Sequence, residues 1–289
     1  MTPPQENADH LFITDLDGTL LRTDESLSDF AVATLNAAIA QGVRVTYCTS
    51  RSFFAARRLC SRVGFRLPAI VSNGAFAIDP NSGAVLHAAV LDRGLAMRVL
   101  DAAAPRGWLP FVCGAQGGRE IVAYREPLSP AQADWVERRR RRRDPRLTPV
   151  ARLTAPEVVY ELLFHAGESE SQALVTWLDA TFGAAVGATR MAETYFPGCY
   201  SVEVANPAAN KAATVRWLAA HLSTPAERIT VFGDNLNDLP MFRVAGRRIA
   251  VANAQPAVRA AADLVIASND EDGVPRFLAA AQPAAIPGA

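Results

Sequence analysis

The sequence is poor in the residues that serve thiolate, metal-thiolate and histidine-based catalysis. Among 289 residues there are four cysteines with no CxxC pair, and four histidines, none beside a serine or cysteine in a recognisable catalytic setting. This spacing excludes an ordinary zinc-thiolate site and gives no sign of a disulfide framework. The cysteines are expected to be small buried apolar side chains. Acid–base chemistry should therefore fall mainly to carboxylates.

The sequence also lacks long apolar runs and an excess of charge. No apolar run approaches the roughly 18 residues that a membrane-spanning helix needs, and 29 basic residues balance 29 acidic ones. A balanced charge provides no global attraction to nucleic acid or to acidic membranes. The polar segment Met1–His10 lacks the basic-then-apolar pattern of a signal peptide. We therefore expect a cytoplasmic monomer or homodimer with no nucleic-acid or membrane partner.

Lysine is almost absent. Of the 29 basic residues 28 are arginine, and Lys211 is the single lysine. This bias suggests a GC-rich coding sequence in which lysine is replaced wherever arginine will serve. A lysine is a compact point charge and an arginine is a planar fork. Lys211 is thus a candidate for a position that a guanidinium cannot fill, with chance survival as the alternative.

Strand and helix patterns alternate along the first part of the chain. Apolar, β-rich runs occur at His10–Thr14, Arg44–Cys48 and Ala69–Val71. Between them lie helical patterns that Ser28 and Ser52 are expected to cap. This order predicts an α/β fold with a doubly wound, parallel, Rossmann-like sheet.

The alternation is interrupted by a long insertion. Asp79–Gly83 predicts a tight turn in a β-hairpin, and the parallel pattern resumes only from residue 205. We predict a core formed by 1–83 and 205–282, with an inserted α+β unit over 84–204. The Pro- and Ala-rich tail 283–289 is predicted to be disordered. The elements expected in the insertion are helices over Asp92–Ala104, Pro130–Arg142 and Glu168–Phe182 and strands over Glu120–Tyr124, Val158–His165 and Tyr200–Val204.

Six consecutive arginines, Arg138–Arg143, stand out in the insertion. Such a run can bind phosphate-rich partners. It is equally consistent with the solvated end of a helix, because cations are favoured near a helix C-terminus. The second interpretation is the simpler one.

Two carboxylates, Asp15 and Asp17, follow the first predicted strand. If the chain stays extended, both side chains point the same way, at the sheet edge where ligands of open α/β sheets bind. Like charges this close require a proton or a cation between them, and Mg²⁺ meets that need. One carboxylate can attack phosphorus, while the other can give a proton to a leaving alcohol and later take one from water. A plain acidic turn is the alternative.

Three further segments supply groups suited to phosphate. Gly233–Asp238 brings oxygen ligands after another apolar strand, although Asn and Asp also favour a helix start. Thr49-Ser50-Arg51 offers hydroxyls and helix N-terminal amides, which suit phosphate oxygens. Lys211, near the start of a helix, adds a positive charge. Together these groups predict phosphoryl transfer, in which catalysis is mostly positioning and charge stabilisation.

This ordered set of motifs resembles the haloacid dehalogenase-like superfamily, and within it the Cof-type class IIB hydrolases. The resemblance rests on Asp15–Leu20, Thr49–Arg51, Lys211 and Gly233–Asp238, and it covers roughly residues 10–87 and 200–278. Ser72–Ala75, Asn253-Ala254 and Ser268–Val274 add to it. Ser50 and Ala212 stand where the family usually has glycine, and mannosyl-3-phosphoglycerate phosphatase-like members share the serine.

The resemblance implies a role for each motif residue. Asp15 would be the nucleophile and Asp17 the general acid/base. Phosphate or substrate would be bound by Thr49, Ser50, Asn73, Lys211 and Asn237. The cofactor Mg²⁺ would be held by Asp15, the backbone carbonyl of Asp17 and Asp234, with Asp238 supporting the site directly or from outside. The inserted unit would be a cap that closes over the site and selects the leaving group.

The function expected from the resemblance is a Mg²⁺-dependent phosphatase that acts on sugar phosphates or similar small phosphomonoesters. Its partner would be a small phosphorylated metabolite. A phosphomutase of the same superfamily and a mannosyl-3-phosphoglycerate phosphatase-like enzyme are the alternatives within that class. A non-catalytic binding protein that docks through Arg138–Arg143 is an alternative outside it. The sequence has no GxxxxGK[ST] motif, which disfavours a P-loop kinase.

Overall fold

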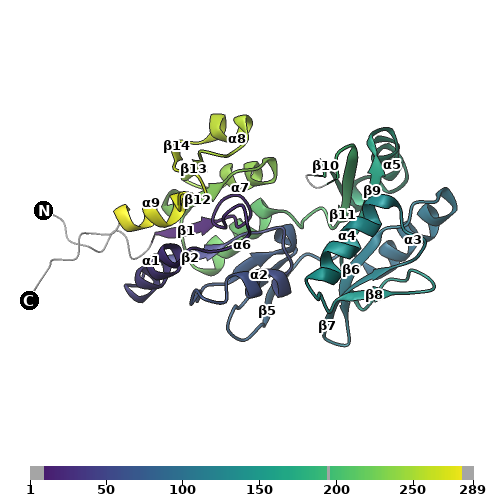
Figure 1. Ribbon diagram of the computed structural model, residues 1–289, viewed down its shortest axis with the longest axis horizontal. Coiled ribbons are helices and arrows are strands. Elements are labelled where there is room, and N and C mark those ends of the chain that lie inside the picture. The colour runs from purple at the N-terminus through teal and green to yellow at the C-terminus, as the bar shows by residue number, and fades with distance from the viewer. Residues whose placement is uncertain (1–9, 194–195, 282–289) are drawn as a thin grey trace, which may run out of the picture. The chain divides into compact units, whose positions relative to one another are not determined.

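The computed structural model describes residues 10–193 and 196–281, so the predicted tail 283–289 lies outside the described residues. The chain divides into two compact units, which Figure 1 shows with their labelled elements. The core unit contains the chain up to Ala88 and from Asn210 onward, and the inserted unit is Ala89–Ala209. No helix within the described ranges has both the length and the apolar character needed to cross a membrane.

A parallel sheet forms the centre of the core unit, as the alternation of strands and helices predicts. Its strand order is β14-β13-β12-β1-β2, and every neighbouring pair is parallel. The central strands β1 and β12 are buried along their whole length, which explains why their sequences are almost continuously apolar. The strands are β1 (Leu11–Thr14), β2 (Arg44–Tyr47), β12 (Ile229–Gly233), β13 (Arg247–Val251) and β14 (Leu264–Ile266).

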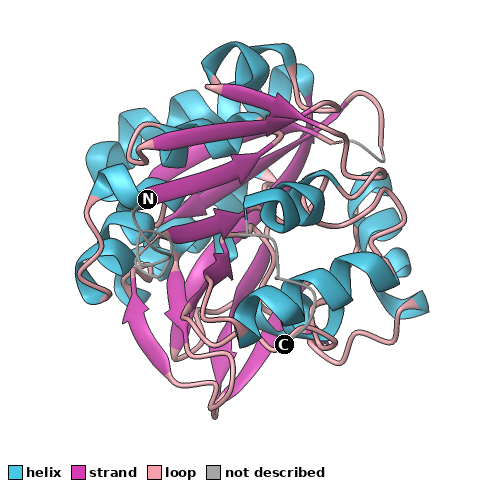
Figure 2. Ribbon diagram, turned by 90° about the vertical axis from the view of Figure 1, so that its left-hand side faces the viewer, coloured by secondary structure: helices cyan, strands magenta, loops and turns pink. Residues whose placement is uncertain are grey.

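Helices cover both faces of this sheet (Figure 2). α1 contacts α9, whereas α6 contacts α7 and α7 contacts α8, so the helices form separate layers. The caps predicted for the first two helices are present, since Ser28 Oγ accepts the Ala31 N–H and Ser52 Oγ accepts the Ala55 N–H. The helices are α1 (Asp29–Ala40), α2 (Phe53–Leu59), α6 (Lys211–His221), α7 (Leu239–Phe242), α8 (Pro256–Ala261) and α9 (Gly273–Ala281).

The third predicted strand departs from the expected arrangement. β3 (Ala69–Val71) pairs antiparallel with β4 (Phe76–Ile78), which pairs with β5 (Val85–Ala88), so these strands form a separate three-stranded sheet. β3 meets the end of β2 only through one parallel bridge, Cys48–Ile70. The reason is the short 3₁₀ turn η2 (Ser72–Gly74), which reverses the chain immediately after β3. The hairpin predicted around residues 79–83 is confirmed.

The inserted unit is built on a six-stranded mixed sheet in the order β10-β11-β9-β6-β7-β8. Its three helices match the predicted ones, but β6, β8 and β10 are strands that the sequence pattern did not indicate. The strands are β6 (Phe111–Gln116), β7 (Arg119–Tyr124), β8 (Leu147–Pro149), β9 (Val158–Gly167), β10 (Gly187–Ala192) and β11 (Cys199–Ala205). The helices are α3 (Arg93–Ala103), α4 (Pro130–Arg141) and α5 (Glu168–Phe182).

The two faces of this sheet are covered differently. Val112 and Leu162 belong to a buried apolar cluster that also contains side chains of α3 and α5. Because side chains alternate along a strand, Phe111 projects from the opposite face, where its ring stacks on Trp135 of α4 with centroids 4.2 Å apart. The main apolar core of the unit therefore lies under α3 and α5, and α4 packs on the other face.

The inserted unit begins and ends later along the chain than the predicted segment 84–204. Val85–Ala88 pairs with β4 and so belongs to the core unit. At the other end, β11 continues to Ala205, and Asn206 Nδ2 donates to the Val90 carbonyl at 2.8 Å. This bond joins the two ends of the inserted unit and explains why it extends to Ala209.

Most arginines of the Arg138–Arg143 run make contacts within the inserted unit. Arg138 lies 2.9 Å from Asp134, one helical turn away. The Arg139 guanidinium lies over the Trp135 ring, 3.1 Å from its centroid. Arg140 donates to the Tyr124 hydroxyl at 2.8 Å. These local contacts favour the interpretation of the run as the polar end of α4.

Candidate active site

Asp15 and Asp234 meet because their strands are neighbours. β1 pairs with β12 in a register that places Thr14 beside Phe232, and the Asp15 N–H donates to the Phe232 carbonyl at 3.0 Å. Each of these residues directly follows its strand, so both lie at the carboxyl edge of the sheet, where open α/β sheets bind ligands. The sequence motifs predicted this meeting.

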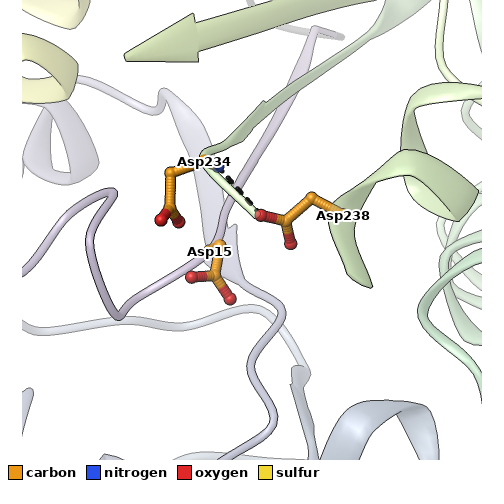
Figure 3. A group of neighbouring side chains, drawn as sticks. All are labelled: Asp15, Asp234 and Asp238. Carbon is orange, nitrogen blue, oxygen red and sulfur yellow. Dashed lines mark hydrogen bonds between the residues drawn. The ribbon is translucent and has the colours of Figure 1, made fainter. Parts of the chain in front are cut away.

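Asp238 completes a group of three carboxylates (Figure 3). One oxygen from each of Asp15, Asp234 and Asp238 lies within 4.8 Å of the others. Asp238 ends the 3₁₀ turn η6 (Leu236–Asp238), and its Oδ2 accepts the N–H groups of Asp234 at 2.9 Å and Asn235 at 3.0 Å. These two bonds fold the loop after β12 back on itself, which brings Asp238 to the other two carboxylates.

Lys211 is the cation of the site and is completely buried on its side chain. Its Nζ donates to Asp15 Oδ1 at 2.5 Å and to Asp238 Oδ1 at 2.6 Å. Lys211 is the first residue of α6, which Asn210 caps by accepting the Ala213 N–H. The single lysine of the chain therefore occupies a compact buried position between two carboxylates, as its survival among 28 arginines suggested.

The charges of the site do not balance. Burial raises the pKa of Asp15 well above its ordinary value, and the carboxylates of Asp238 and Asp234 add to the rise while Lys211 opposes it. Burial, followed by the charge of Asp238, raises the pKa of Asp234 to about 6. Burial alone lowers the pKa of Lys211, but Asp15 and Asp238 outweigh it and keep the ammonium charged. Three carboxylates facing one ammonium leave room for a further positive charge.

Two glycines allow the loops to approach this closely. A Cβ on Gly18 would lie 2.5 Å from Asp234 Oδ2, and the residue has a φ of +72°. A Cβ on Gly233 would lie 2.6 Å from the Asp238 Cβ. Any side chain at either position would push a carboxylate away, so the glycine of the DxDG motif is required by both its conformation and its neighbour.

The Asp17 carboxylate faces a different partner from that of Asp15. Arg51 Nε donates to Asp17 Oδ2 at 2.7 Å and Nη2 donates to Oδ1 at 2.5 Å, a side-on, two-bond arrangement. Among the described residues, the group of three neighbouring carboxylates consists of Asp15, Asp234 and Asp238, and the Asp17 side chain is not part of it. The sequence had singled out Arg51 only as part of a motif, and its pairing with Asp17 depends on loop geometry that spacing alone does not give.

The predicted phosphate-binding residues of the second strand lie next to these loops. Thr49 is fully buried, and Ser50 beside it is exposed. The Asn73 N–H donates to the Thr49 carbonyl at 3.0 Å, which ties the turn after β3 to the end of β2. Asn237 lies half-buried in η6, immediately before Asp238. The structure thus places these residues in the loops around the carboxylates, and their contacts with phosphate stay a prediction.

The turn that contains Asn73 also sets the position of α6. A Cβ on Gly74 would lie 2.5 Å from the Asn210 carbonyl oxygen, and Thr214 Oγ1 donates to the Gly74 carbonyl at 2.6 Å. The start of α6 therefore packs directly on this turn, which fixes the backbone of Lys211.

Three side chains that the sequence did not assign a role brace the loop after β1. Thr19 Oγ1 donates to Asp234 Oδ1 at 2.7 Å. Asn253 Nδ2 donates to the Gly18 carbonyl at 2.7 Å, and Asn269 Nδ2 donates to the Leu21 carbonyl at 2.9 Å. The Asn269 backbone N–H also donates to Asn253 Oδ1 at 3.0 Å. Asn253 and Asn269 belong to the C-terminal motifs of the sequence, which marked them as candidates. The motifs did not indicate that these side chains hold the loop after β1.

Known proteins resemble this chain along almost its entire length. A 5-amino-6-(5-phospho-D-ribitylamino)uracil phosphatase of Bacillus subtilis is 26% identical, with 94% of this chain and 97% of that protein covered. A pyridoxal phosphate phosphatase of Escherichia coli is also 26% identical, with 91% and 95% covered. The crystal structure of TM0651 from Thermotoga maritima superposes with a TM-score of 0.77 at 22% identity, covering 95% of this chain and 98% of that one.

The family model for haloacid dehalogenase-like hydrolases matches residues 12–278. That range includes every motif residue of the carboxylate group and Lys211. The resemblance inferred from the motifs is confirmed, and the chain belongs to the haloacid dehalogenase-like hydrolases.

Proposed function

We propose that this hydrolase is a phosphatase that removes phosphate from small phosphomonoesters through a covalent aspartyl-phosphate, an acyl phosphate, on Asp15. The observation that carries the proposal is the buried Asp15 carboxylate at a strand end, 2.5 Å from Lys211 Nζ. A carboxylate in such a place is held rigidly, and the ammonium can offset the charge of an incoming phosphate.

The reaction follows from the residues in two displacements. The first displacement starts with Asp15 ionised and Asp17 protonated. An Asp15 carboxylate oxygen attacks phosphorus, the bond from phosphorus to the ester oxygen breaks, and Asp17 gives its proton to the departing alcohol oxygen. Water then attacks the phosphorus of the aspartyl-phosphate while Asp17 takes a proton from it. The P–O bond to Asp15 breaks, which releases inorganic phosphate and restores both carboxylic groups to their starting states.

The donor set suits Mg²⁺ as the cofactor. Asp15 and Asp234 supply hard oxygen ligands at the sheet edge, and the backbone carbonyl of Asp17 is the third group that we expect to hold the ion. Both oxygens of Asp238 already accept bonds from Lys211 and the backbone, so we assign Asp238 a supporting role. When bound, the ion neutralises excess charge on the carboxylates and on the phosphoryl oxygens.

The substrate class is proposed from the relatives and from the insertion. The two relatives named above act on a phosphoribityl compound and on pyridoxal phosphate, both small molecules with a phosphate ester. We propose sugar phosphates as the first class to test. The inserted unit, Ala89–Ala209, is proposed as the part that selects the leaving group.

A panel of phosphomonoesters assayed with Mg²⁺ tests the proposal. The wild-type protein should release inorganic phosphate, and Asp15→Asn should lose at least about 10³-fold in kcat because the amide is a poor nucleophile. Asp29→Asn, an exposed aspartate of α1, is the matched control and should keep full activity. An active Asp15→Asn variant would sink the mechanism. An isomerised phosphate ester in place of free phosphate would indicate a mutase.

A further inference from the structure

The Arg51 guanidinium binds a second carboxylate besides that of Asp17. Its Nη2, which donates to Asp17 Oδ1, also lies 3.3 Å from Glu25 Oε1. The Arg51 side chain is 19% exposed, the Glu25 side chain 23% and the Asp17 side chain 44%. The Arg51–Asp17 pair is the shorter one and has two bonds, whereas the Arg51–Glu25 pair is more sheltered from water. Charge pairs weaken as exposure to water increases, so the Glu25 contact adds to the Asp17 contact in holding the guanidinium.

Glu25 is held in place by its own loop. Its N–H donates to the Arg22 carbonyl at 2.8 Å, and its φ is +65°, a conformation that residues other than glycine rarely adopt. The same loop is anchored by an ion pair of 2.8 Å between Arg22 and Asp272. The backbone of Glu25 is thus fixed without help from Arg51.

The Arg51 side chain extends from a well-held backbone, since the Arg51 N–H donates to Thr49 Oγ1 at 3.1 Å and the Arg51 carbonyl accepts the Ser72 N–H at 2.7 Å. Arg51 follows β2 by four residues, so its guanidinium stands at the end of a long, flexible side chain with many rotamers. Asp17 lies in the loop after β1 and is the more exposed of the two. The guanidinium, which lies between the two carboxylates, is therefore the part of this group that Glu25 can hold in place.

We infer that Glu25 is a positioning residue for the reaction: it fixes the Arg51 guanidinium, which in turn fixes the plane of the Asp17 carboxylate. The inference rests on the proposed function, in which Asp17 protonates the departing alcohol. A guanidinium that is bound at one nitrogen by Glu25 can present its remaining N–H groups to Asp17 in a single orientation. Without Glu25 the pair can swing together, and the proton donor loses its fixed direction.

The dependence of the rate on the leaving group tests this inference. The value of kcat/KM reports the steps up to formation of the aspartyl-phosphate, in which an alkoxide must be protonated and a nitrophenolate need not be. Glu25→Gln should lower kcat/KM for a hexose phosphate by roughly tenfold, because a misplaced Asp17 loses part of the rate gain that general acid catalysis provides. For p-nitrophenyl phosphate, whose leaving group needs no proton, the loss should be less than about twofold. Glu25→Asp keeps the charge and should recover part of the loss on the hexose phosphate.

Asp24→Asn is the control, because it removes the same charge from the neighbouring residue, whose carboxylate bonds to Ser26. It should match the wild type on both substrates. Equal losses on the two substrates, an unchanged kcat/KM for Glu25→Gln, or the same selective loss in Asp24→Asn would each overturn the inference. Activity of the wild type on both substrates, together with an inactive Asp15→Asn variant, would still support the proposed phosphatase function. Failure of the Glu25 inference can therefore be told apart from failure of the proposed function. Thermal unfolding of each variant checks that the fold is retained.

Discussion

In the core unit, charged side chains from distant parts of the sequence meet in the interior. Lys211 is completely buried between Asp15 and Asp238, which lie 196 and 27 residues away from it along the chain. Removing such charges from water is costly, and a buried ion pair is weak evidence for stability. An arrangement of this kind is therefore best explained by chemistry.

On α4 of the inserted unit, two charged pairs join residues one helical turn apart. Arg138 pairs with Asp134 and Arg141 with Glu137, each four residues away on α4. Exposed pairs of this spacing add only a few tenths of a kcal/mol. The comparison shows that a conspicuous cluster of charge in the sequence does not mark the reactive site. The contacts described for the six-arginine run lie within the inserted unit, whereas the single lysine lies between two carboxylates of the candidate active site.

The largest effect is expected at Lys211. Lys211→Met leaves two buried carboxylates without their cation, so kcat should fall by about 10³-fold and the free energy of unfolding by about 3 kcal/mol. Lys211→Arg should not restore activity, because the planar guanidinium does not fit a compact site. Steady-state kinetics and urea unfolding measure both effects. Arg216→Met, an exposed change on the same helix, should be neutral; comparable activity in the two Met variants would break the comparison.

The next effect compares one glycine from each unit. Gly18 and Gly107 both have positive φ, +72° and +77°, but a Cβ on Gly18 would meet Asp234, whereas one on Gly107 would meet nothing within 4 Å. Gly107→Ala should cost about 1 kcal/mol of unfolding free energy, and Gly18→Ala about 2 to 3 kcal/mol with most of the activity lost. Chemical denaturation measures both. Equal costs would mean that the approach to Asp234 is unimportant.

The third prediction concerns Mg²⁺ and pH. Because the pKa of Asp234 is raised to about 6 from an ordinary 3.8, the folded protein holds a proton more tightly than the unfolded chain. This carboxylate therefore disfavours folding increasingly as pH rises from about 4 to about 6 in the absence of metal. Mg²⁺ requires the ionised form, so its stabilisation should grow over the same range.

Calorimetry with and without Mg²⁺ tests that dependence. At pH 7.5 and saturating metal, Tm should rise by roughly 5 °C, and at pH 5 by much less. Asp234→Asn should abolish the metal-dependent rise at both pH values. A rise that is equal at pH 5 and pH 7.5, or one that survives in the variant, would contradict the assignment of Asp234.

The smallest effect is expected on the surface of α4. Arg141→Ala breaks the pair with Glu137, in which the side chains are 75% and 48% exposed. The free energy of unfolding should change by less than about 0.5 kcal/mol and kcat should stay unchanged. Denaturant melts and activity assays measure this. A clear loss of activity would mean that the arginine run takes part in function.

The sequence predicted the core fold well where strong local patterns and tertiary packing agree. β1 and β12 are continuous apolar runs that end in acidic motifs, so both the strands and the edge at which Asp15 and Asp234 meet followed from the pattern. β6 and β10 were missed because Phe111–Gln116 and Gly187–Ala192 each contain glycine and alanine and only one β-branched residue. Their pairing with neighbouring strands, and not their own propensity, makes them strands.

The part of the candidate site that consists of motif residues could be predicted from the sequence. Asp15, Lys211, Asp234 and Asp238 are brought together as expected. The pairing of Arg51 with Asp17 and with Glu25 was not predictable, because it depends on where loops of different strands place flexible side chains. The antiparallel pairing of β3 with β4 likewise depends on a turn whose non-glycine residues Ser72 and Asn73 adopt positive φ.

The most direct test of the central claim is to find where phosphate is bound during turnover. The wild-type protein should be mixed with a phosphomonoester substrate, quenched in acid and analysed by peptide mass spectrometry. A phosphate adduct should appear on Asp15, and its rate of formation and decay should account for kcat. An adduct on another residue, or turnover at the full rate with no adduct on Asp15, would contradict the account.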